Sequence, residues 1–151
     1  MSSKIEHENK KVNLEGRWIY RSYHNNPDPE QDDRWFIADL TLNQSSDGSL
    51  TGKLDSGDPN EVYSVNGKVS QDRSRDGKNE DTCFYIYMEA SGATEQTKGH
   101  LYKYHALLIP NWPEGKNQRK AFIGTNVRAK NPGNPSREGK VGCFIATKTD
   151  Q

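Results

Sequence analysis

The chain has 151 residues, of which 30% are hydrophobic and 28% are charged, and its mean hydropathy is −1.08. Because 21 basic residues balance 21 acidic ones, there is no basic field to bind phosphate backbones, and nucleic acid is excluded as an expected partner. No apolar run approaches the ~20 residues that span a bilayer, and the charged amino terminus lacks an apolar signal region. We therefore expect a cytoplasmic protein without a membrane partner.

Two regions differ in composition along the chain. Residues 1–13 are polar throughout, so they are predicted to form a disordered tail. Residues 14–151 have the length of one ordinary domain and are predicted to form it alone.

From residue 15 to residue 150, stretches rich in aromatic and β-branched residues alternate with clusters of Gly, Pro, Asn, Asp and Ser. This rhythm predicts an all-β domain. Eight antiparallel strands in chain order close most simply into an up-and-down β-barrel, which has no edge strands and can hold side chains and one small ligand. The predicted strands are residues 16–24, 34–43, 49–56, 62–70, 82–90, 97–109, 120–129 and 140–147.

Alternation within strands predicts which side chains enter the barrel, because successive residues of a strand point to opposite faces. In the second strand, Trp35 and Ile37 are predicted to face outward. The predicted inward sets are Phe36, Ala38, Leu40 and Leu42, then Leu50, Gly52, Leu54 and Ser56, then Tyr63, Val65, Gly67 and Val69, and finally Phe84, Ile86 and Met88.

The same alternation places Tyr85 and Tyr87 on the outer wall of the fifth strand. Two exposed tyrosines on one strand face are typical of a subunit interface or of a surface that binds another molecule. A homodimer or homotetramer is therefore expected, with the outward residues of the neighbouring sixth strand completing the interface.

The two cysteines, Cys83 and Cys143, fall in the fifth and eighth predicted strands. A disulfide between them would have to cross the lumen, so two free thiols are favoured. The chain has no metal-ligand spacing of the CxxC or HExxH kind. No metal and no cofactor are expected.

Two motifs in the first half of the chain resemble a known group of barrels. Gly16-Arg17-Trp18 resembles the Gly-X-Trp start of lipocalins and avidins, and residues 46–53 (Ser-Asp-Gly-Ser-Leu-Thr-Gly-Lys), followed by Ser56, resemble the avidin turn between strands two and three. Residues 65–69 fall where avidins have a fourth-strand glycine, so the resemblance covers about the first seventy residues. It implies that the Trp18 indole plugs the closed end of the barrel, with Arg128 or Lys148 near its ring, and that Ser56 points inward.

Other positions depart from the avidin pattern. Leu54 and Tyr20 stand where avidins have a pocket tyrosine and asparagine, and strands five to eight contain no tryptophan. Ile123-Gly124-Thr125-Asn126 is similar to the last avidin strand, whose polar residue binds the ureido group of biotin, but it falls in the seventh predicted strand. The ligand is left open, and biotin is one candidate.

An inward Trp18 brings Tyr20, Ser22 and His24 inward with it. In the sixth and seventh strands either face can be the inner one, and only the polar faces would add donors for a small polar or anionic ligand. The main hypothesis is that the barrel binds a small molecule in its lumen without chemistry, and no catalytic residue is predicted. The predicted ligand-binding residues are Tyr20, Ser22, His24, Leu54, Ser56, Val65, Phe84, His100, Tyr102, Asn126 and Arg128.

Two alternatives stay open. A cofactor-independent enzyme of the cyclase or isomerase type would use lumen tyrosines and histidines for acid–base chemistry. A protein-binding or inhibitor barrel would act through its loops, such as residues 111–119, where Trp112 lies between two prolines.

Overall fold

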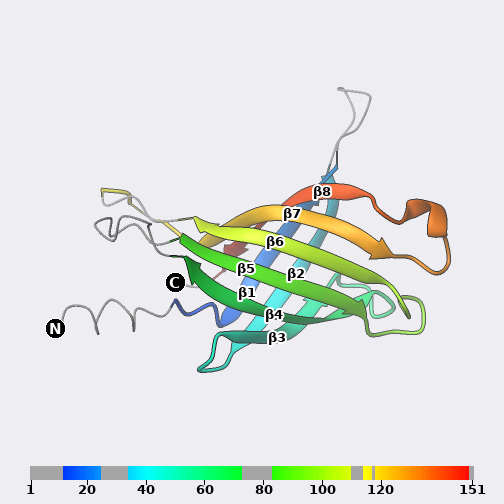
Figure 1. The fold of residues 1–151 in the computed structure, drawn as a ribbon, viewed down its shortest axis with the longest axis horizontal. Helices are drawn as coiled ribbons and strands as arrows, with labels where there is room; N and C mark the ends of the chain where they lie inside the picture. The colour runs from blue at the N-terminus through cyan, green and yellow to red at the C-terminus, as the bar shows by residue number, and fades with distance from the viewer. Residues whose placement is uncertain (1–11, 25–33, 73–82, 110–113, 117, 150–151) are drawn as a thin grey trace.

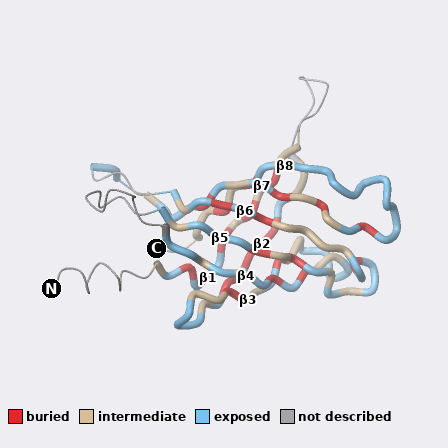
Figure 2. The backbone as a smooth tube through the Cα atoms, in the orientation of Figure 1, coloured by how far each residue is buried: buried red, intermediate tan, exposed pale blue. Residues whose placement is uncertain are grey.

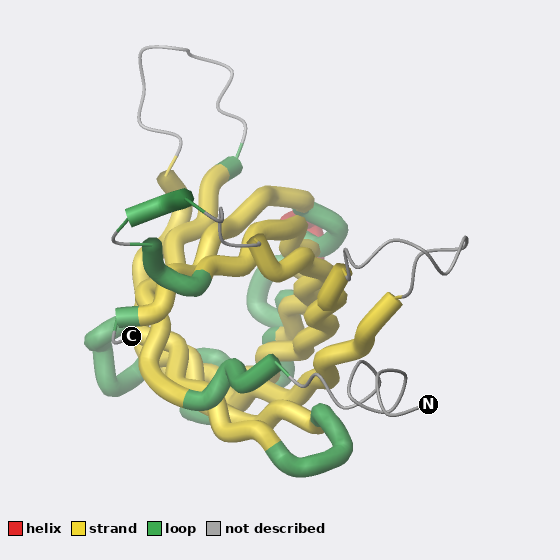
Figure 3. The backbone as a smooth tube through the Cα atoms, turned by 90° about the vertical axis from the view of Figure 1, so that its left-hand side faces the viewer, coloured by secondary structure: helices red, strands yellow, loops and turns green. Residues whose placement is uncertain are grey.

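The computed structural model describes residues 12–24, 34–72, 83–109, 114–116 and 118–149. Its eight antiparallel strands each pair with the preceding strand, and β8 pairs with β1 to close a barrel (Figures 1 and 3). This confirms the eight-stranded up-and-down barrel and is consistent with the calycin-like fold that the resemblance implies. The strands are β1 (Gly16–Tyr23), β2 (Arg34–Gln44), β3 (Ser49–Asp55), β4 (Val62–Asp72), β5 (Cys83–Gly92), β6 (Leu101–Ile109), β7 (Ala121–Lys130) and β8 (Val141–Lys148).

Buried and exposed residues alternate along the strands, as a barrel with one inner and one outer face requires (Figure 2). The predicted inner faces of the second to fifth strands are confirmed by buried Leu40, Leu54, Val65 and Ile86 among others. In β6 and β7 the polar faces turn inward, because Tyr104, Ala106, Phe122, Asn126 and Arg128 are the buried residues of these strands. The lumen therefore contains polar side chains from both strands.

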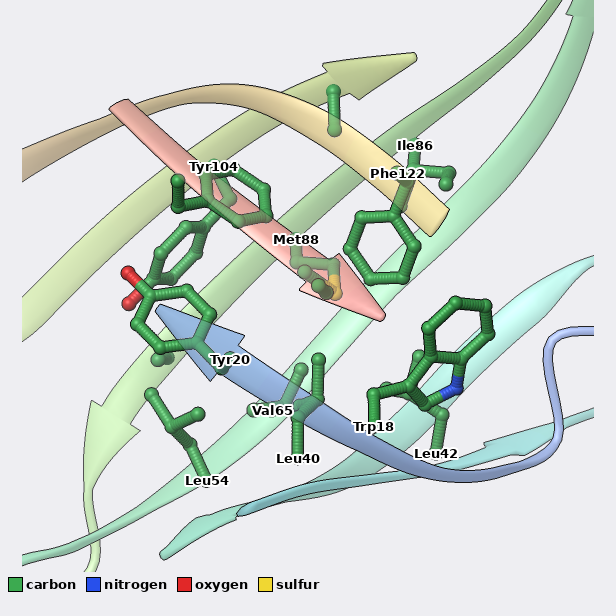
Figure 4. Close-up of a cluster of buried hydrophobic side chains, with 14 of the residues drawn as sticks. Trp18, Tyr20, Leu40, Leu42, Leu54, Val65, Ile86, Met88, Tyr104 and Phe122 are labelled. Carbon is green, nitrogen blue, oxygen red and sulfur yellow. The ribbon is translucent and has the colours of Figure 1, made fainter. Parts of the chain in front are cut away.

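Trp18 closes one end of the barrel, as predicted. Its side chain is fully buried, its ring lies 4.8 Å from that of Phe122, and its Nε1–H donates to the carbonyl oxygen of Leu14 at 3.0 Å (Figure 4). The indole thus fills the apolar end and has a partner for its one polar group. This is the end at which β2, β4, β6 and β8 finish.

The predicted cation–π contact at the Trp18 ring is not found among the described residues, although Lys148, one of the two predicted cations, lies opposite Trp18 in the pairing of β1 with β8. Among the described residues, the cation–π pairs are those of Arg128 with Trp35 and Tyr102 and of Lys140 with Trp35. Arg128 is six positions beyond Phe122 on β7, which at ~3.3 Å per residue places it roughly 20 Å along the strand from the residue that contacts Trp18. Arg128 therefore belongs to the opposite end of the barrel.

Several strand ends differ from prediction by a few residues. The sixth strand begins at Leu101 rather than residue 97, because residues 97–100 complete a turn in which Gly99 has a φ of 79° and His100 N–H donates to the carbonyl of Thr97. His24 and Ser56, predicted at the ends of strands, follow the last residues of β1 and β3. His100 is consequently a turn residue.

The described residues also bear on the cysteines and on membrane spanning. Cys83 and Cys143 are both free and exposed on the outer wall, as favoured. Within the described ranges, no helix has the length and hydropathy to cross a membrane. Most of the predicted tail, the loop around residues 25–33 and Trp112 lie outside the described residues.

Candidate functional site

A cavity of about 280 Å³ lies inside the barrel, toward the end at which β1, β3, β5 and β7 finish. Six of the eight strands, or the turns leading into them, contribute to its wall. Its volume is close to the lower limit for small-molecule sites. The lining residues are Tyr20, Ser22, Trp35, Phe36, Leu54, Glu61, Tyr63, Tyr102, Tyr104, Asn126 and Arg128.

The inner end of the cavity is aromatic. The rings of Tyr20, Tyr104 and Phe144 lie within 5.3 to 5.8 Å of one another, and Phe144 in turn contacts Phe122 beneath them. The rings of Tyr20 and Tyr104, both labelled in the close-up of the core, meet edge to face with an interplanar angle of 89° (Figure 4). This stack separates the cavity from the Trp18 end, so the lumen is filled at one end and hollow at the other.

Burial keeps three lining tyrosines protonated. Desolvation raises the pKa of Tyr20 to about 12, although the neighbouring hydroxyls of Ser22 and Tyr104 offset part of the rise. Desolvation also raises the pKa values of Tyr63 and Tyr104 well above their usual range. At neutral pH these phenols are therefore hydrogen-bonding groups and not bases.

Asn126 supplies a buried amide on the β7 side of the cavity. Its side chain is 2% exposed, and its Nδ2 donates to Tyr20 Oη at a long 3.4 Å. Its Oδ1 has no hydrogen-bond partner among the described residues. A buried carbonyl oxygen in this state needs a donor from water or from a bound molecule.

Arg128 lies on the same face of β7, two residues further toward the open end. Its guanidinium Cζ is 4.6 Å from the centroid of the Trp35 ring and 5.7 Å from that of Tyr102, and its Nε donates to Tyr102 Oη at 3.3 Å. Only 7% of Arg128 is exposed. The cavity therefore has a nearly buried cation held between two aromatic side chains.

The inward position of Trp35 contradicts the outward prediction, and a bulge explains it. The pairing of β1 with β2 runs from Ser22–Phe36 directly to Tyr23–Arg34, which leaves Trp35 without a partner on β1. A bulge of this kind interrupts strict alternation and redirects the extra side chain. Both Trp35 and Phe36 consequently line the cavity.

The structure brings together six of the eleven predicted ligand-binding residues. Tyr20, Ser22, Leu54, Tyr102, Asn126 and Arg128 all line the cavity, and the other five do not.

The other five lie nearby or at another level of the barrel. His24 packs its ring edge against Trp35, Ser56 Oγ donates to the Glu61 carbonyl, and His100 is in the β5–β6 turn. Val65 is buried in the core, whereas Phe84 is at the start of β5, near the Trp18 end. Val65 and Phe84 miss the cavity because alternation gives the face of a residue and not its height along the barrel axis, whereas His24, Ser56 and His100 lie outside the strands.

Five lining residues were absent from the predicted site: Trp35, Phe36, Glu61, Tyr63 and Tyr104. Alternation already placed Phe36 and Tyr63 inward, and Tyr104 shares a face with Tyr102. An estimate of how far along the barrel axis each of these residues lies would have added all three to the predicted site. Glu61 precedes β4 in a turn that Ser56 holds through its hydroxyl. Neither Glu61 nor the bulged Trp35 gives a periodic signal.

Within the described residues, the side chains that commonly bind metal ions lie apart from one another. In the part of the chain that the structure describes, no three His, Cys, Asp or Glu side chains are grouped to hold a metal ion.

No protein-family model matches the chain, and no curated protein matches its sequence. The cavity is therefore the feature of this chain that points to a function.

Proposed function

We propose that this barrel binds a small polar molecule non-covalently in the cavity between Tyr20, Trp35, Asn126 and Arg128. The observation that carries the proposal is a hollow of about 280 Å³ that brings an amide, a guanidinium and several phenols together inside a barrel whose other end is filled by Trp18 and Phe122. Ligand sites of this kind combine a mostly aromatic wall with a few placed polar groups.

Unsatisfied polar groups support the same conclusion. Leaving a buried hydrogen-bonding group without a partner costs about 1–3 kcal/mol. Asn126 Oδ1 is in that state among the described residues, and its amide makes only one long bond. If the barrel served only as a scaffold, an apolar residue at position 126 would make the folded state more stable. In a binding protein, an N–H or O–H of the ligand would donate to Asn126 Oδ1.

The resemblance to avidins and lipocalins supports ligand binding and supplies one probe. Asn126, which corresponds to the polar residue of the last avidin strand motif, lines the cavity. Ser56, which corresponds to the inward avidin serine, instead holds the turn of Glu61. Biotin is therefore worth testing, together with smaller molecules that share single features with it.

Binding is favoured over the cyclase or isomerase alternative. Neither His24 nor His100 lines the cavity, and the three buried tyrosines have raised pKa values. A general base poised near neutral pH is the group that such chemistry requires. Of the lining residues, only the Glu61 carboxylate has the character of a base.

The proposal is tested by filling the cavity. Ligand-observed NMR and calorimetry would measure the binding of biotin, 2-imidazolidinone, benzamide and benzoate to the purified protein and to Ser22→Leu, which adds volume at a lining position. Ser64→Leu is the matched control, because Ser64 is exposed on the outer wall of β4. We expect at least one probe to bind, with affinity at least tenfold weaker in Ser22→Leu and unchanged in Ser64→Leu. The proposal fails if no probe binds, or if the cavity-filling variant binds as well as the control.

A further inference from the structure

We infer that the ligand is an anion with a flat or apolar body, and that its negative group lies against the guanidinium of Arg128. This inference rests on the proposed function and specifies the class of ligand. It is carried by the position of Arg128 in the cavity wall and by the absence of a carboxylate that balances it in the described structure.

Among the residues that the structure describes, buried Arg128 has no ion-pair partner. The ion pairs of the described residues are Arg17 with Asp39 and Lys53 with Asp55, all of them solvent-exposed side chains of the outer wall. Arg128 instead donates one hydrogen bond, from Nε to Tyr102, and lies over aromatic rings. Arginine is rarely buried to this extent unless it is paired, because removing the charge from water is costly.

The aromatic neighbours compensate only part of that cost. Contact with the face of Trp35 stabilises the cation, but the contact occupies only the flat side of the guanidinium and not the N–H donors along its edge, of which Nε donates to Tyr102. A planar guanidinium edge matches the two oxygens of a carboxylate or a similar oxyanion. The rings of Trp35 and Tyr102 also fix the group in place, so little side-chain entropy would be lost on binding.

The rest of the wall determines the body of the ligand. Six aromatic side chains line the cavity, and only Leu54 adds an aliphatic surface. A flat ring can stack on such a wall. Glu61 is the one carboxylate in the lining, and no atom of it is close enough to Arg128 to form an ion pair. It would repel an anion, so its removal should strengthen binding.

The inference is tested with three probes of nearly equal shape and different charge: benzoate, benzamide and benzylamine. Calorimetry on the full chain should give benzoate an affinity at least tenfold higher than that of either other probe. Glu61→Gln should bind benzoate more tightly, and Arg128→Gln should lose the preference for benzoate. Arg17→Gln is the matched control, since it removes the same charge from the exposed outer wall, and it should retain the preference.

The possible results separate the inference from the proposed function. If benzamide or benzylamine binds at least as tightly as benzoate, the anion inference is overturned and the ligand-binding function stands. If the preference for benzoate is lost equally in Arg17→Gln, a general field and not the Arg128 contact is responsible, which also overturns the inference. If none of the three probes, nor biotin or 2-imidazolidinone, binds, the proposed function itself fails. The probe series needs no variant, so it decides even if Arg128→Gln does not fold.

Discussion

Tyr20 and Trp18 are two positions apart on β1, yet they have different physical roles. Trp18 is fully buried against Phe122 and Leu14 at the filled end, and Tyr20 places its hydroxyl at the inner end of the cavity. Period-two alternation puts both side chains inside the barrel. The rise along the strand places Trp18 in the filled end and Tyr20 at the cavity.

Because of the buried tyrosines, the free energy of unfolding should depend on pH in the alkaline range. Because the pKa of Tyr20 is about 12 in the folded protein and near 10.0 in the unfolded chain, both states are protonated below about pH 10 and the stabilisation is complete there. Between pH 10 and about 12 only the unfolded state loses the proton, so the free energy of unfolding should fall, by about 3 kcal/mol for Tyr20 alone. Urea denaturation at a series of pH values checks this. A flat profile up to pH 12 would contradict it, and Tyr20→Phe should reduce the slope.

The two described tryptophans allow a direct comparison of residue roles. Trp18→Ala should cost about 3–5 kcal/mol, because it removes a fully buried indole and leaves a cavity. Trp35→Ala should cost clearly less stability, since Trp35 is only partly buried and already borders a hollow, but it should weaken ligand binding. Denaturation curves of both variants give the comparison, and equal losses of stability would argue against separate roles for the two ends.

At the scale of strands, close approach of neighbours constrains single positions. A Cβ added to Gly124 on β7 would lie 1.8 Å from the backbone oxygen of His105 and 2.6 Å from Ala106 Cα. Both belong to β6, which pairs with β7 at this point. Only glycine permits the two backbones to come this close.

Gly124→Ala should therefore destabilise the barrel by about 3 kcal/mol or more, the upper part of the range for overpacked sites. Gly133→Ala is the control, because Gly133 has nothing within 4 Å of an added Cβ, and it should change stability by less than about 0.5 kcal/mol. Thermal unfolding of the two variants measures the difference. Similar unfolding midpoints for the two variants would show that β6 and β7 can move apart to accommodate the added methyl group without loss of stability.

The strands were predictable from sequence because aromatic and β-branched residues alternate with polar ones between clear turn signals. Tyr20 and Ser22 followed from the same alternation, starting from Trp18, and Leu54 followed from alternation in the third strand. Alternation left the inner face of the sixth and seventh strands open, so Tyr102, Asn126 and Arg128 were site residues only if the polar faces turned inward. Trp35 was not predictable, because the bulge opposite Ser22 and Tyr23 depends on pairing with β1 and not on the local sequence. Phe84 and Val65 were assigned to the correct face and the wrong level, since period two carries no information on height.

At the scale of the whole molecule, the outer wall has one apolar surface across three adjacent strands. Tyr85, Leu107 and Ile123 are 42%, 44% and 48% exposed and lie opposite one another in the pairing of β5, β6 and β7. Tyr87 and Ile109 extend this β5–β7 patch. Contiguous patches of exposed apolar residues often mark the sites at which a protein binds another molecule.

We propose that the β5–β7 patch associates with a second copy of the chain. A two-fold axis through the patch would place it against itself, and a chain with 21 basic and 21 acidic residues has no net charge to oppose self-association. Light scattering should show a dimer or a larger assembly that Leu107→Glu disrupts. Ile37→Glu is the control, since Ile37 is equally exposed on β2, outside the patch. A strict monomer at high micromolar concentration would contradict the prediction.

The pairing of β1 with β8 also governs how the chain can fold. Trp18 lies opposite Lys148 in that pairing, so the barrel closes only when segments from nearly opposite ends of the chain meet. Contacts of such high sequence separation slow folding into the range of milliseconds to seconds. Until β8 is in place, the open sheet has two unpaired edges, which are the features that promote aggregation of folding intermediates. The yield of native protein on refolding should therefore fall steeply as protein concentration rises.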